Sequence, residues 1–243
     1  MKPRELIRPY NWKDRKILLR DGVLYVPDYY TAHQGFSLPL WSLPEVFEKE
    51  APVSIEYCSG NGEWIVEKAL EFPNKNWVGV EKRFDRVRKI YSRRHNEGAD
   101  NLFIGYGEAV TMTRHYFPEA TVDEVYVNFP DPWPKGRHAK HRLITDTFAS
   151  EVHRVLKPGG TITLVTDDLA YKEIIVGVFL AHPGFASLHP HPYYIDHIEN
   201  YGTSYFDSLW RGLGCKIHFV QFQGVVDENC CQGDPFPIPA FGA

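Results

Sequence analysis

From residue 51 onwards, short apolar runs alternate with longer amphipathic segments. The runs that predict buried strands cover residues 53–58, 76–81, 101–106, 122–129 and 161–166. The segments with apolar side chains at helical spacing cover residues 63–72, 83–95, 144–156 and about 168–181. Because strands that alternate with helices build βαβ units, the pattern predicts an α/β fold with a doubly wound, mostly parallel sheet covered on both faces.

The pattern changes near both ends of the chain. Five prolines interrupt residues 1–50, which predicts an irregular N-terminal arm. Residues 215–223 alternate as a last strand does, and the Gly/Pro-rich residues 224–243 predict a poorly ordered tail. We therefore divide the chain into a basic arm (1–50), a main domain (51–223) and a tail (224–243). Within the main domain, the K-P-G-G stretch at 157–160 is expected to end the preceding helix, with glycine as its C-cap.

Composition restricts the setting in which the protein works. No apolar run approaches the roughly 20 residues of a membrane span, and the N-terminus lacks the apolar segment of a secretory signal. The four cysteines, Cys58, Cys215, Cys230 and Cys231, form no C-x-x-C pair. We therefore expect a reduced, cytoplasmic protein with no metal. For its assembly the sequence leaves a monomer and a homodimer open.

Positive charge gathers in three segments although the net charge is −4. Residues 1–20 contain seven Lys/Arg and two acids, residues 82–95 contain seven and one, and residues 126–143 contain four and one. Lys/Arg side chains gathered in this way can form a face that binds a polyanion such as RNA.

The first strand runs into a glycine turn, E-Y-C-S-G-N-G, at residues 56–62. The turn lacks the third glycine of a dinucleotide fingerprint, and Glu63 at the start of the helix disfavours a pyrophosphate there. A cationic ligand fits better, and S-adenosylmethionine carries a sulfonium and an ammonium. We expect Gly60 to let its methionine part approach the backbone, and Glu56 to face its positive charge.

Two more acids follow the next two strands. Glu81 ends the second strand about 20 residues after the turn, where a carboxylate accepts hydrogen bonds from the ribose hydroxyls of an adenosine ligand. Glu108 follows the third strand, and we expect it to cap the adenine amino group. Three acids at successive strand ends favour an adenosylmethionine site over a nicotinamide site.

The loop after the fourth strand carries the most specific motif of the chain. Residues 129–142 read F-P-D-P-W-P-K-G-R-H-A-K-H-R. This stretch resembles the signature of the bacterial tRNA (guanine-N7)-methyltransferases, F-P-D-P-W-x-K followed by R-H-x-K-x-R. The resemblance extends from about residue 53 to 217, through E-x-x-x-G-N-G at 56–62, G-V-E at 79–81 and T-D-x-x-x-Y-x-E at 166–173. The T-x-F/Y-E segment of the family corresponds to Ser204–Asp207.

The resemblance implies a fold, an activity and a set of site residues. The fold is the seven-stranded, Rossmann-like sheet of class I methyltransferases, and the activity is methylation of N7 of guanosine 46 in the variable loop of tRNA. The positions that bind the methyl donor correspond to Glu56, Glu81, Glu108 and Asp131. The positions that face tRNA correspond to Lys135, Asp167 and the segment 204–207.

Several positions depart from the family pattern. Cys58 stands where the family usually has glycine, and Glu108 stands where it usually has aspartate. Ser204 and Asp207 replace threonine and glutamate, so a hydroxyl and a carboxylate are kept.

The chemistry of guanine N7 explains why one rigid carboxylate suffices. N7 has an in-plane lone pair and no proton, so the reaction needs no general base and depends on placing N7 in line with the methyl group. Asp131, held between prolines, is our catalytic candidate, since it can hydrogen-bond the guanine edge and offset the developing positive charge. Trp133 is expected either to stack on a base or to close the loop. Four basic side chains are expected to contact phosphates: Lys135, Arg137, Lys140 and Arg142.

Three alternatives remain open at this point. The motif loosely resembles the D/N-P-P-Y/F loop of enzymes that methylate exocyclic amines, in which Asn128 would accept the amino protons. Cys58 is the best argument for an RNA-binding protein without activity on a methyltransferase fold. A nicotinamide oxidoreductase is disfavoured by the missing third glycine.

Overall fold

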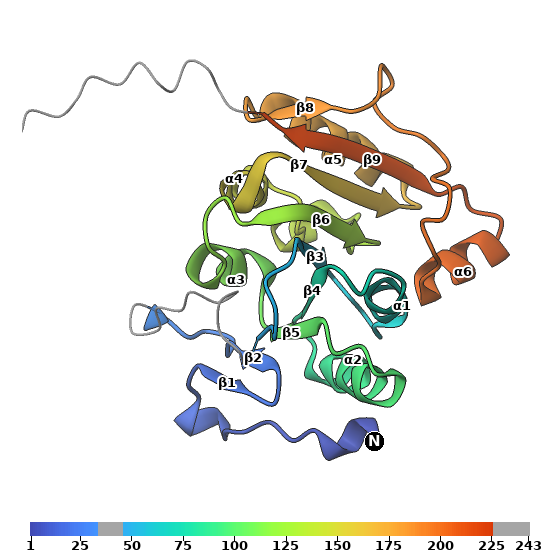
Figure 1. The fold of residues 1–243 in the computed structure, drawn as a ribbon. Coiled ribbons are helices and arrows are strands. Elements are labelled where there is room, and N and C mark those ends of the chain that lie inside the picture. Colours follow the sequence, from blue (N-terminus) through green and yellow to red (C-terminus); the bar gives the residue numbers. More distant parts are fainter. Residues whose placement is uncertain (34–45, 226–243) are drawn as a thin grey trace, which may run out of the picture.

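A single nine-stranded sheet runs through the computed structural model, in which residues 1–33 and 46–225 are described (Figure 1). Of the tail that we expect to be poorly ordered, only residues 224 and 225 lie within this range. The pair Cys230–Cys231 lies outside it. The strands are β1 (Leu18–Arg20), β2 (Val23–Tyr25), β3 (Val53–Tyr57), β4 (Asn76–Glu81), β5 (Leu102–Tyr106), β6 (Val122–Asn128), β7 (Leu156–Thr166), β8 (Phe185–Ser187) and β9 (His218–Gly224).

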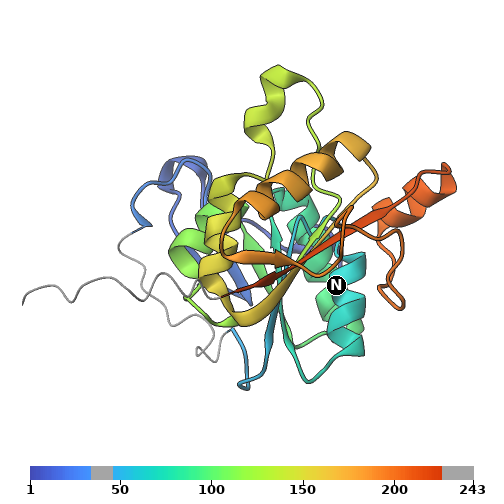
Figure 2. The ribbon, with the colours of Figure 1, turned by 90° about the horizontal axis from the view of Figure 1, so that it is seen from above.

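Helices cover both faces of this sheet (Figures 1 and 2). The α-helices are α1 (Glu63–Glu71), α2 (Phe84–Glu97), α3 (Ala109–Tyr116), α4 (Asp146–Val155), α5 (Leu169–Ala181) and α6 (Tyr205–Gly212). Short 3-10 helices are η1 (Pro3–Glu5), η2 (Trp12–Asp14) and η5 (Gly136–His141). Helices α3, α4 and α5 share one apolar cluster with the sheet, and α1 and α2 share a second. The expected doubly wound arrangement is therefore confirmed.

The strand order places the end of β3 beside the end of β6. The order is β1-β2-β5-β4-β3-β6-β7-β9-β8, and β5, β4, β3, β6 and β7 are parallel. After β3 the chain adds strands on one side of the sheet, and from β6 it adds them on the other. The point where the direction reverses lies between the carboxyl ends of β3 and β6, where ligands bind in open α/β sheets.

The N-terminal segment contributes to the sheet, which the proline pattern did not predict. Strands β1 and β2 form an antiparallel pair, and β2 adds to the parallel edge through pairing of Val23 with Ile104 and of Tyr25 with Tyr106. The described sheet thus has nine strands. Six of them, β3 to β7 and β9, lie where the pattern predicts strands, and the pattern does not predict β8. Residue propensity does not predict the three-residue strands β1 and β2, because they form through pairing with neighbouring strands, β2 with β5 and β1 with β2.

The expected C-cap at 157–160 is wrong. Helix α4 ends at Val155 with Leu156 in extended conformation, and residues 157–160 already belong to β7. The pairing with β6 shifts register between Val122 and Glu124, next to this stretch. A Cβ atom at Gly160 would lie 3.0 Å from the carbonyl oxygens of Asp123 and Lys157, so close backbone packing explains this glycine.

Replacing Gly160 by alanine should therefore destabilise the fold. We expect Gly160→Ala to lower the free energy of unfolding by about 1–3 kcal/mol, because the added methyl group meets backbone atoms that cannot move aside. The matched control is Gly177→Ala in the middle of α5, where an added Cβ has no neighbour within 4 Å and alanine favours the helix. Urea denaturation measures both, and equal stability of the two variants would contradict this reading.

Candidate active site

The turn after β3 is built from left-handed backbone. Cys58, Gly60 and Gly62 have φ of +61°, +56° and +83°. A Cβ at Gly62 would lie 3.0–3.2 Å from atoms of Ile90 on α2, so this glycine also allows α1 and α2 to pack closely. The positive φ of Cys58 gives a physical reason for the glycine that the related motif has at this position.

Glu56 is a buried acid whose carboxylate is only half satisfied. Its side chain is 1% exposed, and Oε1 accepts a 2.7 Å hydrogen bond from Nδ2 of Asn128. Oε2 is buried and has no hydrogen-bond partner among the described residues. Burial raises the pKa of Glu56 to about 7; the charges of Glu81 and Glu63 act in the same direction, and the Asn128 bond opposes them. A free, buried carboxylate oxygen at the switch point fits a cationic ligand.

Glu81 holds the glycine turn in place. Its side chain is 4% exposed, and its oxygens accept hydrogen bonds from the backbone N–H of Gly60 (3.0 Å) and of Arg83 (2.8 Å). The guanidinium of Arg86 lies 3.7 Å away. Burial raises the pKa of Glu81, and these backbone bonds and Arg86 oppose the shift. The predicted contact with ribose stays a prediction.

Glu108 caps a helix that the apolar pattern did not reveal. It is the N-cap of α3, and its oxygens accept hydrogen bonds from the backbone N–H of Val110 (3.1 Å) and of Thr111 (2.7 Å). Its side chain is exposed. Its expected contact with adenine is not tested by these bonds, which account for the carboxylate by themselves.

The loop that carries Asp131 leaves β6 through a strained backbone. Phe129 and Trp133 have φ of +50° and +42°. Pro130, which directly precedes Asp131, is buried. The guanidinium of Arg142 donates hydrogen bonds to the carbonyls of Pro132 (2.8 Å) and Trp133 (3.1 Å). Arg142, expected to contact phosphate, thus holds the motif loop together.

Asp131 faces the same turn as the two buried acids. It is exposed, and its charge helps to raise the pKa of the Cys58 thiol. Burial is the main cause of that shift, and the carboxylates of Glu81, Asp131 and Glu56 add to it in that order. The charges of all three acids therefore reach Cys58, and each acid lies at or just after the end of one of the neighbouring strands β3, β4 and β6.

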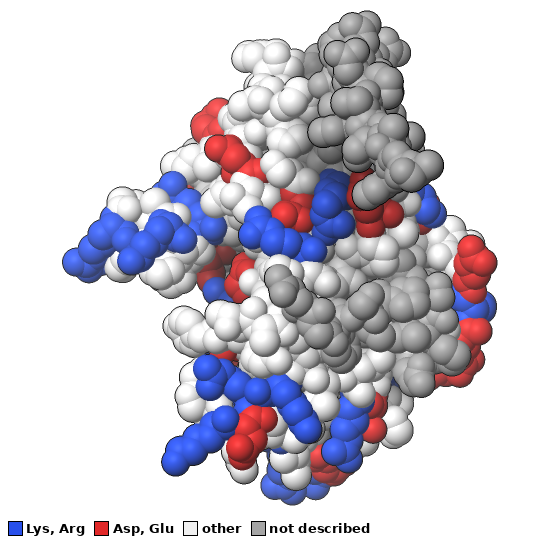
Figure 3. Space-filling model, turned by 90° about the vertical axis from the view of Figure 1, so that its left-hand side faces the viewer, with Lys and Arg blue, Asp and Glu red and all other residues white. Residues whose placement is uncertain are grey.

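Basic side chains continue from this loop onto a projection. The 3-10 helix η5 stands away from the sheet (Figure 2), and Lys135 at its N-cap and Arg137 and Lys140 within it are exposed. The ring of Trp133 packs against His138 and His141, with centroids 5.7 and 5.5 Å apart. In Figure 3, Lys and Arg cover the tip of this projection and a second area at the bottom of the molecule, and the surface between them is hollowed.

The remaining expected tRNA-side residues lie at the ends of β7 and at α6. Asp167 follows β7 and is half-buried, and burial, aided by the charge of Asp168, raises its pKa. Ser204 caps α6 by accepting a hydrogen bond from the backbone N–H of Asp207 (3.1 Å). Asp207 is 5% exposed and paired with Arg211 at 3.0 Å. Ser204 and Asp207 thus already stabilise α6, and their contact with tRNA stays a prediction.

Phe206 joins the site although no local pattern singles it out. Its Cε2 would lie 4.0 Å from a Cβ at Gly60, and its ring centroid is 6.4 Å from that of Phe129 and 5.7 Å from the Arg86 guanidinium. The ring therefore touches both the glycine turn and the Asp131 loop. The only available signal was its place in the T-x-F/Y-E segment.

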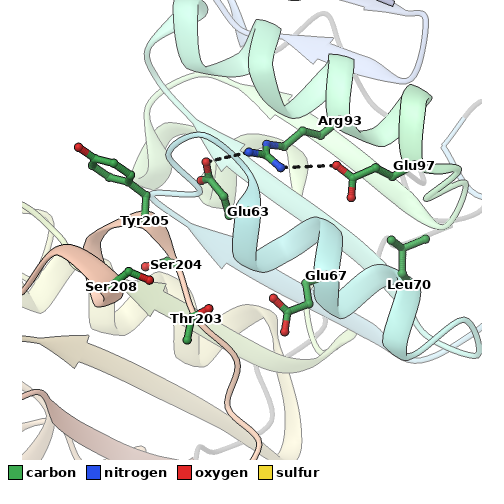
Figure 4. Close-up of a pocket in the computed structure, with 9 residues that line it drawn as sticks. All are labelled: Glu63, Glu67, Leu70, Arg93, Glu97, Thr203, Ser204, Tyr205 and Ser208. Carbon is green, nitrogen blue, oxygen red and sulfur yellow. Dashed lines mark hydrogen bonds and ion pairs between the residues drawn. The ribbon is translucent and has the colours of Figure 1, made fainter. Parts of the chain in front are cut away.

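A cleft of about 560 Å³ opens beside this site, between α1, α2 and the start of α6 (Figure 4). Arg93 lines it on the α2 side, paired with Glu63 at 3.0 Å and Glu97 at 3.5 Å. The cleft is bordered by Ser204 and Tyr205 but not by Glu56, Glu81 or Asp131. It lies next to the expected donor site and does not coincide with it.

Residues 1–33 and 46–225 contain no group of three or more His, Cys, Asp or Glu side chains placed to hold a metal ion. No helix in this part of the chain has the length and apolar character needed to cross a membrane. Cys58 and Cys215 are free thiols.

Comparison with known proteins identifies the family. The sequence profile described as "Putative methyltransferase" matches residues 50–220. A Chlamydia muridarum protein named tRNA (guanine-N(7)-)-methyltransferase is 47% identical over 91% of this chain and 97% of its own length. The chain belongs to the tRNA (guanine-N7)-methyltransferase family. A Cronobacter sakazakii protein of the same name is 31% identical over 90% of this chain and 92% of its own.

A solved structure supports the fold independently of the family. The structure titled "Structure of an Antibiotic Related Methyltransferase" matches with a TM-score of 0.54, at 17% identity, over 79% of this chain and 96% of that one. At this identity the match shows the fold alone. It agrees with the predicted Rossmann-like sheet of a class I methyltransferase.

Glu56 should make the stability of the protein depend on pH. Its pKa is about 7 in the folded chain against an ordinary 4.5, so the folded chain binds the proton more tightly. The contribution of this group to the free energy of unfolding is therefore largest below pH 4.5 and falls by about 3 kcal/mol as the pH rises through 7.

We expect Glu56→Gln to stabilise the protein relative to wild type more at pH 8 than at pH 5, by about 2–3 kcal/mol, in urea denaturation. Glu67→Gln makes the same change at an exposed position of α1 and serves as the control. A stability difference between Glu56→Gln and wild type that is the same at both pH values would contradict the assignment.

Proposed function

We propose that the protein transfers the methyl group of S-adenosylmethionine to N7 of guanosine 46 in the variable loop of tRNA. The observation that carries the proposal is that Glu56, Glu81 and Asp131 stand at or just after the neighbouring ends of β3, β4 and β6, where the charges of all three act on Cys58. Two of these acids are buried on the donor side, and the third stands on the loop that faces solvent.

The donor side fits a cationic adenosine ligand. The free oxygen of Glu56 can accept a hydrogen bond from the ammonium group, and the negative charge suits the sulfonium. Glu81 already accepts the Gly60 N–H, and its carboxylate has further lone pairs for ribose hydroxyls. Gly60 keeps the backbone open, and Glu108 lies at the following strand end for the adenine. When bound, S-adenosylmethionine supplies an electrophilic methyl group.

The acceptor side needs orientation and charge and no proton transfer. Guanine N7 attacks with its own lone pair, so Asp131 serves by accepting hydrogen bonds from N1–H and the exocyclic amine of the guanine. The positive charge that develops on the purine is stabilised by this carboxylate. The strained backbone at Phe129 and Trp133, the hydrogen bonds from Arg142 and the buried Pro130 hold Asp131 in one orientation.

Asn128 argues against methylation of an exocyclic amine. That reaction would use its side chain as an acceptor for the amino protons. Asn128 is 5% exposed, its Nδ2 donates to Glu56, and its Oδ1 accepts from Tyr201 at 2.7 Å. Because Asn128 is buried and its Oδ1 already accepts a hydrogen bond from Tyr201, it is poorly placed to accept the amino protons of a substrate, which favours N7.

The charged surface supports tRNA as the substrate. Exposed Lys135, Arg137 and Lys140 on the projection and the basic N-terminal segment lie on either side of a hollow (Figure 3). Phosphates on both sides of a target nucleotide could contact these two areas while the base enters the site between them. A tRNA-modifying enzyme with free thiols suits the cytoplasm, where we place this protein.

Asp131→Ala should reduce methyl transfer to unmodified tRNA by about 100-fold or more in kcat/KM, because it removes the carboxylate that orients guanine. Since Asp131 is exposed, the unfolding midpoint should stay close to that of wild type. Asp146→Ala, an exposed acid at the start of α4, is the control and should keep full activity. Nucleoside mass spectrometry of the product should show 7-methylguanosine. Near-normal turnover by Asp131→Ala, or an N-methyl amine as product, would refute the proposal.

Lys135→Ala should weaken tRNA binding and lower the slope of log K against log salt by about one. The reason is that one phosphate contact, and the counterion released with it, is lost. Lys157→Ala is a suitable control because Lys157 lies near the start of β7, at the end of the strand away from the site, and pairs with Asp123 at 2.9 Å. An unchanged salt slope for Lys135→Ala in filter binding would show that Lys135 contacts no phosphate.

A further inference from the structure

A line of hydrogen bonds connects Glu56 to the segment that precedes α6. The hydroxyl of Tyr201 donates to Oδ1 of Asn128 at 2.7 Å, and Nδ2 of Asn128 donates to Oε1 of Glu56 at 2.7 Å. These two bonds fix the orientation of the Asn128 amide, because its oxygen must face Tyr201 and its nitrogen must face Glu56. Only the free Oε2 of Glu56 is then left for a ligand.

Tyr201 is itself anchored to the helix that opens with the glycine turn. Nε1 of Trp64 on α1 donates to the carbonyl of Tyr201 at 2.7 Å, and the two rings lie 5.2 Å apart. Nζ of Lys68 donates to the carbonyl of Asn200 at 2.9 Å. These bonds hold the Tyr201 segment against α1.

The same segment leads directly to the acceptor side. Ser204, three residues after Tyr201, caps α6, and Phe206 on α6 touches the glycine turn and Phe129. Burial raises the pKa of the Tyr201 hydroxyl, so it stays a donor at neutral pH. No group in the line other than Glu56 changes its charge near neutrality.

We propose that Tyr201 and Asn128 are positioning residues that aim the free oxygen of Glu56 at the methyl donor and tie the donor site to α6. The inference rests on the proposed donor site. Without the Tyr201 hydroxyl, Asn128 loses the bond that fixes its amide and is free to turn its oxygen towards Glu56, where two acceptors repel. The ionised form of Glu56 is then less stable, and a cationic ligand binds less well.

The groups that act on the charge of Glu56 lie on every neighbouring element. They are Asn128 on β6, Ser59 in the glycine turn, Glu81 on β4 and Glu63 at the start of α1. The charge of Glu56 in turn acts on Cys58 and Tyr201 on the adjoining loops. Substitution of Tyr201 changes only the hydrogen bonds that reach Glu56 through Asn128. The remaining charges are the same in both proteins, so a shift in pH dependence reports on the line itself.

The test is calorimetric binding of S-adenosylmethionine between pH 6 and 8 to wild type, Tyr201→Phe and Tyr126→Phe. Tyr126 is the matched control, because its ring also packs on Trp64 and its hydroxyl bonds Glu124 and not Asn128. We expect Tyr201→Phe to bind the donor at least about fivefold more weakly at pH 7 and its affinity to recover at higher pH than that of wild type. Tyr126→Phe should follow the wild-type profile.

Asn128→Ala and the double variant Tyr201→Phe/Asn128→Ala complete a cycle. If Tyr201 acts through Asn128, the double variant should bind the donor no more weakly than Asn128→Ala alone. Additive losses, or identical pH profiles for Tyr201→Phe and Tyr126→Phe, would overturn the inference and leave the proposed function standing. Failure of the wild type to bind S-adenosylmethionine would overturn both.

Discussion

The site depends on one buried carboxylate that, among the described residues, has a hydrogen-bond partner for only one of its two oxygens. Glu56 lies at the end of β3, where one oxygen is held by Asn128 and the other has no partner in the described part of the chain. An ionised carboxylate in such a place is costly until a cation reaches it. A positively charged ligand would offset this cost, whereas the phosphate-binding turns of dinucleotide enzymes accept an anion.

The sheet brings the other parts of the site to this carboxylate. Because β3 lies between β4 and β6, the strand ends bring Glu81 and Asp131 to the same turn as Glu56. Glu81 fixes the turn through Gly60, and the loop after β6 is stiffened by prolines and by Arg142. Methyl transfer to guanine N7 needs no proton transfer, so acids held rigidly in position can serve the reaction without a general base.

Local pattern predicted the strands, the main helices and the acids at the strand ends, since each depends on a few consecutive residues. It failed where distant contacts decide. The β1–β2 hairpin exists because β5 offers an edge, and the glycines at 159–160 belong to β7, where the backbone of Asp123 packs against Gly160. Tyr201 and Phe206 reach the site from more than 130 positions after Glu56, and only the family motif pointed to that region. Cys58 was noticed as a departure from the motif, but its left-handed backbone needed the structure.

The most direct test of the central claim is the number of protons released when S-adenosylmethionine binds. Calorimetry at pH 6.5 in buffers of different ionisation enthalpy measures this number. Because the pKa of Glu56 is about 7, most molecules carry the proton before binding, and a cation held by the carboxylate must expel it. We predict release of more than about half a proton per donor bound by wild type, and none by Glu56→Gln. Binding by wild type without proton release would contradict the role of Glu56.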